Sequence, residues 1–142
     1  EKGYLHWGHD ISPAENPFEA GLDFAVKLNK ENNFIGKEKL IELKSKKSKQ
    51  FAMFCLENSE PGNPLLLHDE PIYYRENIIG ETTSGNYSFC YDKNIAFGYI
   101  DSKINKNDMQ NEIFQIEVSK VKYDAKLLLL PLHDPKNIKI KS

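Results

Sequence analysis

Short apolar stretches separated by turn-forming residues dominate the chain from residue 50 onward. Within these stretches apolar and polar positions alternate with the period of a β-strand, and β-branched and aromatic residues are frequent. The predicted strands cover residues 50–57, 71–74, 78–83, 94–100, 113–118 and 121–130. Ser119 and Lys120 would form the hairpin turn between the last two strands. Several short strands without intervening helices predict a small antiparallel barrel or sandwich.

The first 49 residues are rich in turn formers and predict a different kind of structure. Residues 16–19 (Asn-Pro-Phe-Glu) form a helix start, because Asn caps, Pro fits the first turn and Glu returns a hydrogen bond. In residues 22–28 the apolar positions alternate, so a helix and a strand both remain open there. Residues 36–47 predict a helix with Leu40 and Leu43 on its buried side. The fold class indicated is α+β.

Composition narrows the range of partners. The 142 residues carry a net charge of −2, and Arg75 is the one arginine among 19 basic residues. Such a balance provides no general positive field for nucleic acid or an anionic membrane. We therefore expect no nucleic-acid partner.

The longest apolar run and the two cysteines indicate in which cellular compartment we expect the protein. Residues 127–130 are four consecutive leucines, far too few to span a bilayer, and the sequence contains no signal peptide. Cys55 and Cys90 are distant in sequence and lie among apolar residues, which favours two buried, reduced thiols over a disulfide. We expect a cytoplasmic protein with no membrane partner.

The chain starts at Glu1, without an initiator methionine and in the middle of a dense pattern of aromatic and charged residues. Because chain termini are usually sparse and poorly ordered, this start predicts the C-terminal piece of a longer protein.

Two candidate chemistries have weak support. His6, His9 and Asp10 resemble a metal cluster, but a zinc site needs a further ligand, and no paired spacing supplies one. Histidines packed or exposed in a loop are the favoured interpretation, so we expect no metal site. Ser84 lacks the glycine two residues earlier that a nucleophile elbow requires, and a structural role is favoured. We expect no catalytic residue in this chain.

Glu1 is a third candidate. A carboxylate accepts two parallel N–H bonds, which suits a heteroaromatic ring that presents an N–H beside an exocyclic amine, as in pterins and guanines. Tyr4 and Trp7 follow closely and would offer flat apolar walls for such a ring. The residues alone also fit a terminal carboxylate and two core aromatic side chains.

Several motifs, in order along nearly the whole chain, resemble the folate-binding region of the glycine-cleavage T-protein (aminomethyltransferase). The first group is Glu1-x-Gly3, Trp7-Gly8-His9-Asp10-Ile11, Asn16-Pro17-Phe18-Glu19-Ala20-Gly21-Leu22, Lys27-Leu28-Asn29-Lys30 and Phe34-Ile35-Gly36-Lys37-Glu38. The second group resembles its C-terminal barrel: Ile79-Gly80-Glu81-Thr82-Thr83-Ser84-Gly85-Asn86-Tyr87-Ser88 and Ile95-Ala96-Phe97-Gly98-Tyr99. Glu1-Lys2-Gly3-Tyr4-x-His6-Trp7 and His133-Asp134-Pro135-Lys136-Asn137 are most similar to sarcosine and dimethylglycine dehydrogenases.

The resemblance implies a domain division and a function. Residues 1–49 would be the tail of the folate-binding domain, and residues 50–142 a six-stranded antiparallel, Greek-key-like β-barrel. The parent would be an FAD-dependent N-methylamine dehydrogenase whose flavin domain and catalytic carboxylate lie upstream of residue 1. Its folate region would transfer the one-carbon unit to tetrahydrofolate, and the piece alone would be inactive.

The resemblance also implies site residues. Glu1 matches the glutamate that holds the pterin, and Tyr4 and Trp7 match apolar or aromatic positions beside it. Two alternatives remain: a flavin-free tetrahydrofolate-dependent aminomethyltransferase or demethylase, and a non-catalytic binding module. The sequence indicates neither the amine nor the oligomeric state.

Overall fold

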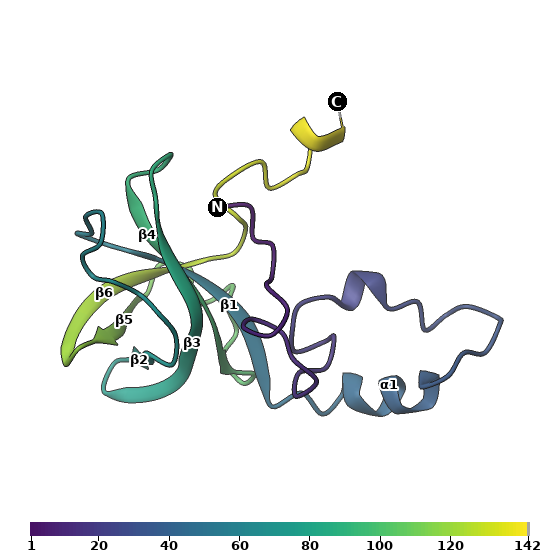
Figure 1. Cartoon of the computed structure of the whole chain (residues 1–142). Coiled ribbons are helices and arrows are strands. Elements are labelled where there is room, and N and C mark those ends of the chain that lie inside the picture. Colours follow the sequence, from purple (N-terminus) through teal and green to yellow (C-terminus); the bar gives the residue numbers. More distant parts are fainter. Residues whose placement is uncertain (142) are drawn as a thin grey trace.

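The computed structural model describes residues 1–141, and its centre is a closed barrel of six antiparallel strands (Figure 1). The strands are β1 (Lys49–Leu56), β2 (Pro71–Tyr74), β3 (Asn77–Ser88), β4 (Lys93–Asp101), β5 (Ile113–Val118) and β6 (Val121–Leu128). Around the barrel their order is β1-β4-β3-β2-β5-β6, and β6 pairs with β1 to close it. The predicted α+β class with a six-stranded barrel is confirmed.

The connections explain the Greek-key character of the barrel. β2, β3 and β4 follow one another as neighbours, whereas β1 lies beside β4, the far strand of that meander. The long connection from β1 to β2 allows β1 to lie beside β4, and this arrangement of four strands is a Greek key. Closure leaves every strand paired on both sides, so the barrel has no free edge.

Inward-facing apolar side chains of β1, β2, β4, β5 and β6, together with Leu66 of the β1–β2 connection, form one core. Phe54 and Phe114 are fully buried, with ring centroids 5.4 Å apart in an edge-to-face arrangement. The core cluster comprises Ala52, Phe54, Leu56, Leu66, Ile72, Ala96, Ile100, Phe114, Ile116, Ala125 and Leu127. Alternation along the strands produces this inner face, as the sequence pattern predicts.

Residues 1–48 lie along one side of the barrel, and α1 (Lys37–Lys44) and the loop before it project away from the barrel (Figure 1). A 3₁₀ helix, η1 (Asp23–Ala25), occupies the stretch where a helix and a strand were both open, so the strand expectation is wrong there. Leu40 and Leu43 are half-buried, and α1 has no fully buried residue, contrary to the expected buried side. No helix within residues 1–141 has the length and apolarity needed to cross a membrane.

β3 differs most from its predicted bounds of residues 78–83, because it continues to Ser88. Its pairing with β4 shifts register between Thr82 and Ser84 and then continues as far as Ser88 opposite Lys93. The shift is a β-bulge, which breaks the regular alternation that the sequence pattern depends on. β3 therefore runs through Gly85 without a turn.

The two cysteines have different environments. Both are free; Cys55 is buried, as expected, and burial raises the pKa of its thiol. Cys90 is exposed at the β3–β4 turn, so the prediction that both thiols are buried is wrong for Cys90. Cys90 lies beyond Ser88, the last residue of β3. Its apolar neighbours in the sequence are therefore not part of the barrel core.

Phe54→Ala should lower the free energy of unfolding by about 3–5 kcal/mol, because it removes a fully buried ring and leaves a cavity. Phe89→Ala is the matched control: this ring is 77% exposed, and we expect a change within about 0.5 kcal/mol. Urea unfolding followed by circular dichroism measures both. Equal losses for the two variants would contradict the described core.

Native protein should react with one equivalent of a thiol reagent, at Cys90. Reaction at Cys55 requires unfolding, because the sulfur is buried and its thiolate is disfavoured. Cys90→Ser should abolish the native reaction, and Cys55→Ser should leave it unchanged. Two rapidly reacting thiols in native protein would contradict the placement of Cys55.

Candidate functional site

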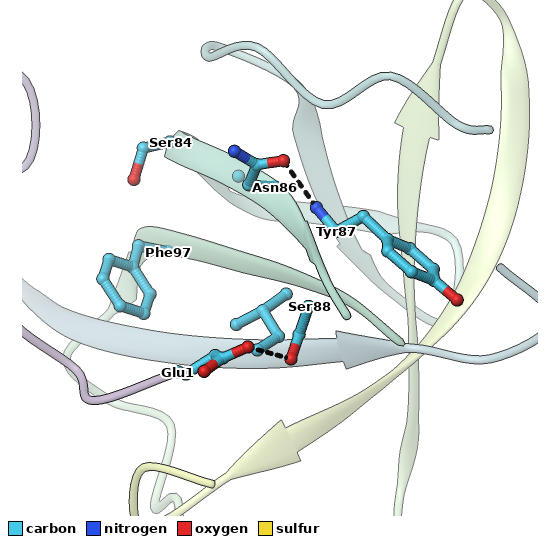
Figure 2. A pocket seen from close by; sticks show the side chains of 8 residues that line it. Glu1, Ser84, Asn86, Tyr87, Ser88 and Phe97 are labelled. Carbon is cyan, nitrogen blue, oxygen red and sulfur yellow. Dashed lines mark hydrogen bonds between the residues drawn. The ribbon is translucent and has the colours of Figure 1, made fainter. Parts of the chain in front are cut away.

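Glu1 lies at a hollow of about 330 Å³ against the paired halves of β3 and β4 (Figure 2). The lining residues are Glu1, Ser84, Gly85, Asn86, Tyr87, Ser88, Ile95 and Phe97. Ser88 Oγ donates a hydrogen bond of 2.5 Å to Glu1 Oε1. This bond is the main cause that lowers the pKa of Glu1, and hydrogen bonds from Cys90 add smaller contributions. Glu1 therefore presents an ionised carboxylate at neutral pH.

The structure does not bring Tyr4 and Trp7 into this hollow. Tyr4 is 65% exposed and lines a separate hollow of about 700 Å³, together with Phe24, Phe51 and Pro131. Trp7 is 69% exposed and forms an isolated bridge with Ile11. Both rings lie on the same irregular segment as Glu1, but they face elsewhere. The folate-binding role predicted for all three residues stays a prediction.

The aromatic ring that faces Glu1 comes instead from the barrel. Phe97 on β4 lines the hollow, as does Tyr87 on β3, whose ring points away from Glu1 (Figure 2). They and Ser88 belong to the two barrel motifs in the sequence, although no pattern in the sequence links these motifs to Glu1. Pairing of Asn86 with Ile95 in the register of β3 and β4 brings these motifs together.

Asp10 is a second carboxylate of the N-terminal segment, and it joins this segment to the barrel. Its side chain is buried, at 2% exposure. Thr83 Oγ1 and Ser84 Oγ donate to Asp10 Oδ1 at 2.6 and 2.7 Å, and the backbone N–H of His6 donates to Oδ2 at 2.8 Å. In addition, Tyr99 Oη donates to the backbone carbonyl of Asp10 at 2.8 Å. Ser84 thus has the structural role that the sequence favoured.

These contacts also decide how the His6, His9 and Asp10 cluster is arranged. The two imidazole rings stack with centroids 4.7 Å apart, while both Asp10 oxygens accept bonds from the barrel and the backbone. No group of three or more metal-ligating side chains suited to an ion is found in residues 1–141.

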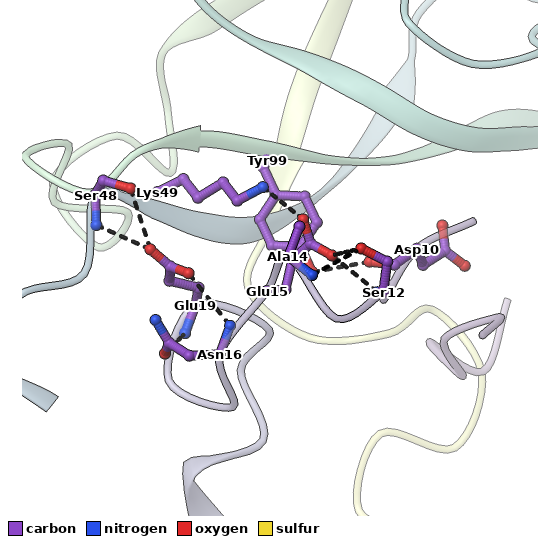
Figure 3. Close-up of polar contacts among 9 residues, drawn as sticks. All are labelled: Asp10, Ser12, Ala14, Glu15, Asn16, Glu19, Ser48, Lys49 and Tyr99. Atoms are coloured by element: carbon purple, nitrogen blue, oxygen red, sulfur yellow. Dashed lines mark hydrogen bonds and ion pairs between the residues drawn. The ribbon is translucent and has the colours of Figure 1, made fainter. Parts of the chain in front are cut away.

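Glu15 extends the docking of the N-terminal segment onto β1 and β4 (Figure 3). Lys49 Nζ lies 2.6 Å from Glu15 Oε1 and also sits 4.7 Å from the centroid of the Tyr99 ring. Burial, followed by the charges of Glu15, Asp10 and Glu19, raises the pKa of Tyr99. Tyr99 therefore remains a neutral hydrogen-bond donor to Asp10 at physiological pH.

Glu19 makes the third attachment (Figure 3). Asn16 Oδ1 accepts bonds from the backbone of Phe18 and Glu19, and Glu19 Oε2 accepts from the Asn16 N–H. The predicted capping arrangement is thus present, but it closes a single turn, and no α-helix continues from that turn. Glu19 Oε1 also accepts from Ser48, and the Glu19 carbonyl accepts from Phe51, so this turn is fixed to the start of β1.

Asp10→Ala should lower the free energy of unfolding by about 1.5–3 kcal/mol, because it removes the buried carboxylate that accepts bonds from the half-buried hydroxyls of Thr83 and Ser84 and from the His6 N–H. Asp108→Ala removes a carboxylate from an exposed loop and serves as the control, with an expected change within about 0.5 kcal/mol. Urea titration measures both. A similar small effect in the two variants would show that Asp10 does not hold the segment.

The barrel matches a known protein family. The family described as the glycine cleavage T-protein C-terminal barrel domain matches residues 49–134. Dimethylglycine dehydrogenase, mitochondrial, of Homo sapiens is 36% identical over 137 residues, covering 93% of this chain and 15% of that protein. Aminomethyltransferase of Listeria innocua is 37% identical over 127 residues, covering 89% of this chain and 33% of that protein.

A solved structure supports the fold. The crystal structure of glycine cleavage system aminomethyltransferase T from Bartonella henselae superposes with a TM-score of 0.77 at 23% sequence identity, covering 94% of this chain and 36% of that chain. The chain thus spans a minor part of these relatives, 15% of the human dehydrogenase and 33% of the Listeria aminomethyltransferase. The resemblance found in the sequence motifs is confirmed: the chain belongs to the glycine cleavage T-protein C-terminal barrel family.

Proposed function

We propose that the chain is the C-terminal, tetrahydrofolate-binding region of an FAD-dependent N-methylamine dehydrogenase of the dimethylglycine and sarcosine type. Residues 1–49 would complete the folate-binding domain, and residues 50–142 would form the barrel that supports it. The observation that carries this proposal is the ionised Glu1 carboxylate at a hollow walled by the barrel. The identity with the human dehydrogenase supports the choice of parent.

The residues at the hollow suit the pterin end of tetrahydrofolate. The ring presents an N–H beside an amino group, and an ionised carboxylate such as Glu1 accepts such a pair in parallel. Phe97 and Ile95 supply apolar wall, and about 330 Å³ is space for a ring system. Tetrahydrofolate would there serve as the acceptor of a one-carbon unit. Tyr4 and Trp7 are retained as proposed contacts for the rest of the ligand, since both rings are exposed.

Exposed apolar side chains on residues 24–41 support a larger enclosing protein. Phe24, Ile35 and Ile41 are 71%, 104% and 53% exposed. Such side chains in one segment are typical of a surface that another domain covers. FAD, the catalytic carboxylate and the contacts to the N-methylated amine would belong to that domain, so the chain alone would be inactive. Binding by an incomplete pocket is weak, because ordering consumes contact energy.

A flavin-free, tetrahydrofolate-dependent aminomethyltransferase is the second candidate. The observation in its favour is the 37% identity with the Listeria aminomethyltransferase. The visible absorbance of the purified full-length protein separates the two: bound flavin supports the dehydrogenase, and its absence supports the transferase. A non-catalytic binding module would bind no reduced folate in the same preparation.

The cytoplasm remains the proposed compartment. The human dehydrogenase carries "mitochondrial" in its name, which describes that protein. We propose a small N-methylated amine and folate as partners, and no nucleic acid.

Glu1→Gln in the full-length protein should weaken tetrahydrofolate binding at least tenfold. The variant replaces a charged acceptor of two N–H bonds by an amide, and hydrogen bonds to charged groups contribute about 1.5–3 kcal/mol, where 1.4 kcal/mol is tenfold. Isothermal titration calorimetry under anaerobic conditions gives the Kd. The control is Glu76→Gln in the exposed turn between β2 and β3, with unchanged affinity. Unchanged affinity in Glu1→Gln would refute the proposed site.

A further inference from the structure

The C-terminal tail of the described chain passes next to the N-terminal residues at one side of the barrel (Figure 1). Lys2 Nζ donates to the backbone carbonyl of Asp134 at 2.7 Å and to its Oδ2 at 3.0 Å. The backbone N–H of His133 donates to the Glu1 carbonyl at 3.0 Å. Three successive contacts therefore join two segments separated by more than 130 positions, on both sides of the Glu1–Lys2 peptide.

The turn that Asp134 begins holds its side chain in the orientation that meets Lys2. Its Oδ1 accepts the N–H of Ile138 at 2.7 Å, which leaves Oδ2 directed to Lys2. The Asp134 side chain is 6% exposed and that of Lys2 is 20% exposed. Burial by itself would raise the pKa of Asp134, but the bonds from Lys2 and from backbone amides lower it to about 2. Asp134 therefore keeps its negative charge opposite Lys2 Nζ across the physiological pH range.

Close packing adds to the contact. A Cβ on Gly3 would lie 2.7 Å from Pro131 Cγ, so the two segments approach each other closely at that point. Tyr91 Oη lies 3.2 Å from His133 Nδ1 and connects the same tail to the β3–β4 turn. That turn follows Ser88, whose hydroxyl binds the Glu1 carboxylate. The tail thus braces both the backbone of Glu1 and the turn after its side-chain partner.

We propose that the Lys2–Asp134 pair is a clamp that positions Glu1 for tetrahydrofolate, and that Lys2 and Asp134 are positioning residues. The inference rests on the proposed function of Glu1. Glu1 is itself exposed, and the residue next to it is fixed by a largely buried ion pair. Releasing the pair loosens the Glu1 backbone, so the bond from Ser88 no longer suffices to hold the carboxylate in one orientation. Ordering the carboxylate for the ligand then costs binding energy.

The test measures tetrahydrofolate Kd by anaerobic calorimetry in the full-length protein for a double-mutant cycle. Asp134→Asn keeps an oxygen for the Ile138 N–H but removes the charge opposite Lys2. We expect about fivefold weaker binding. In the Glu1→Gln background the same change should alter Kd less than twofold, because it acts through Glu1. A general structural defect would instead give the same fivefold loss in both backgrounds and would overturn the clamp.

Lys2 supplies an independent variant should Asp134→Asn fold poorly. Lys2→Gln should reproduce the fivefold loss, and Lys2→Arg should restore affinity to within twofold. Asp108→Asn, on the exposed β4–β5 loop, controls for loss of a surface charge. If Glu1→Gln weakens binding while Asp134→Asn and Lys2→Gln do not, the clamp is refuted and the folate site stands. If Glu1→Gln also has no effect, the proposed function fails.

Discussion

The contact of Asp10 with β3 is the constraint on which the rest of the site depends. Thr83 and Ser84 are consecutive in β3, and consecutive strand residues normally point to opposite faces. Both donate to the same oxygen of Asp10 because the register shift between Thr82 and Ser84 adds a residue to β3 there. The bulge thus creates a two-hydroxyl site for one buried carboxylate. With Asp10 fixed, the segment before it runs along β3 toward Ser88, where Glu1 is found.

Regular strands follow from the sequence because their alternation is uninterrupted. β2 and β5 have the predicted bounds, and the predicted turn at Ser119 and Lys120 is confirmed, with positive φ at both residues as a tight hairpin requires. The second half of β3 is different. Its small polar side chains face the N-terminal segment and the hollow, so their pattern reflects contacts made far along the chain. A one-dimensional pattern has no signal for such contacts, and the predicted strand stopped at the bulge.

The same reason limits what the sequence says about the site. Proximity in sequence suggested that Tyr4 and Trp7 would accompany Glu1, as they would on a regular element. The segment is irregular, so their rings face away from the Glu1 hollow. The groups that do meet Glu1 come from Ser88 and His133, through pairing and tail contacts. Motif resemblance identified the right regions of the barrel, and the register of β3 and β4 decided which residues meet.

Four carboxylates of the N-terminal segment contact the barrel or the start of β1. Their surroundings distinguish the carboxylates that attach the segment from the one that is proposed to bind a ligand. Asp10, Glu15 and Glu19 accept bonds from hydroxyls, amides or Lys49, and little of each is open to solvent. Their hydrogen-bonding capacity is used within the fold, and removing such a partner costs stability. Glu1 is exposed, ionised and placed at a hollow with apolar wall. Of these four acids, Glu1 is therefore the one whose geometry leaves it able to accept N–H donors from a ligand.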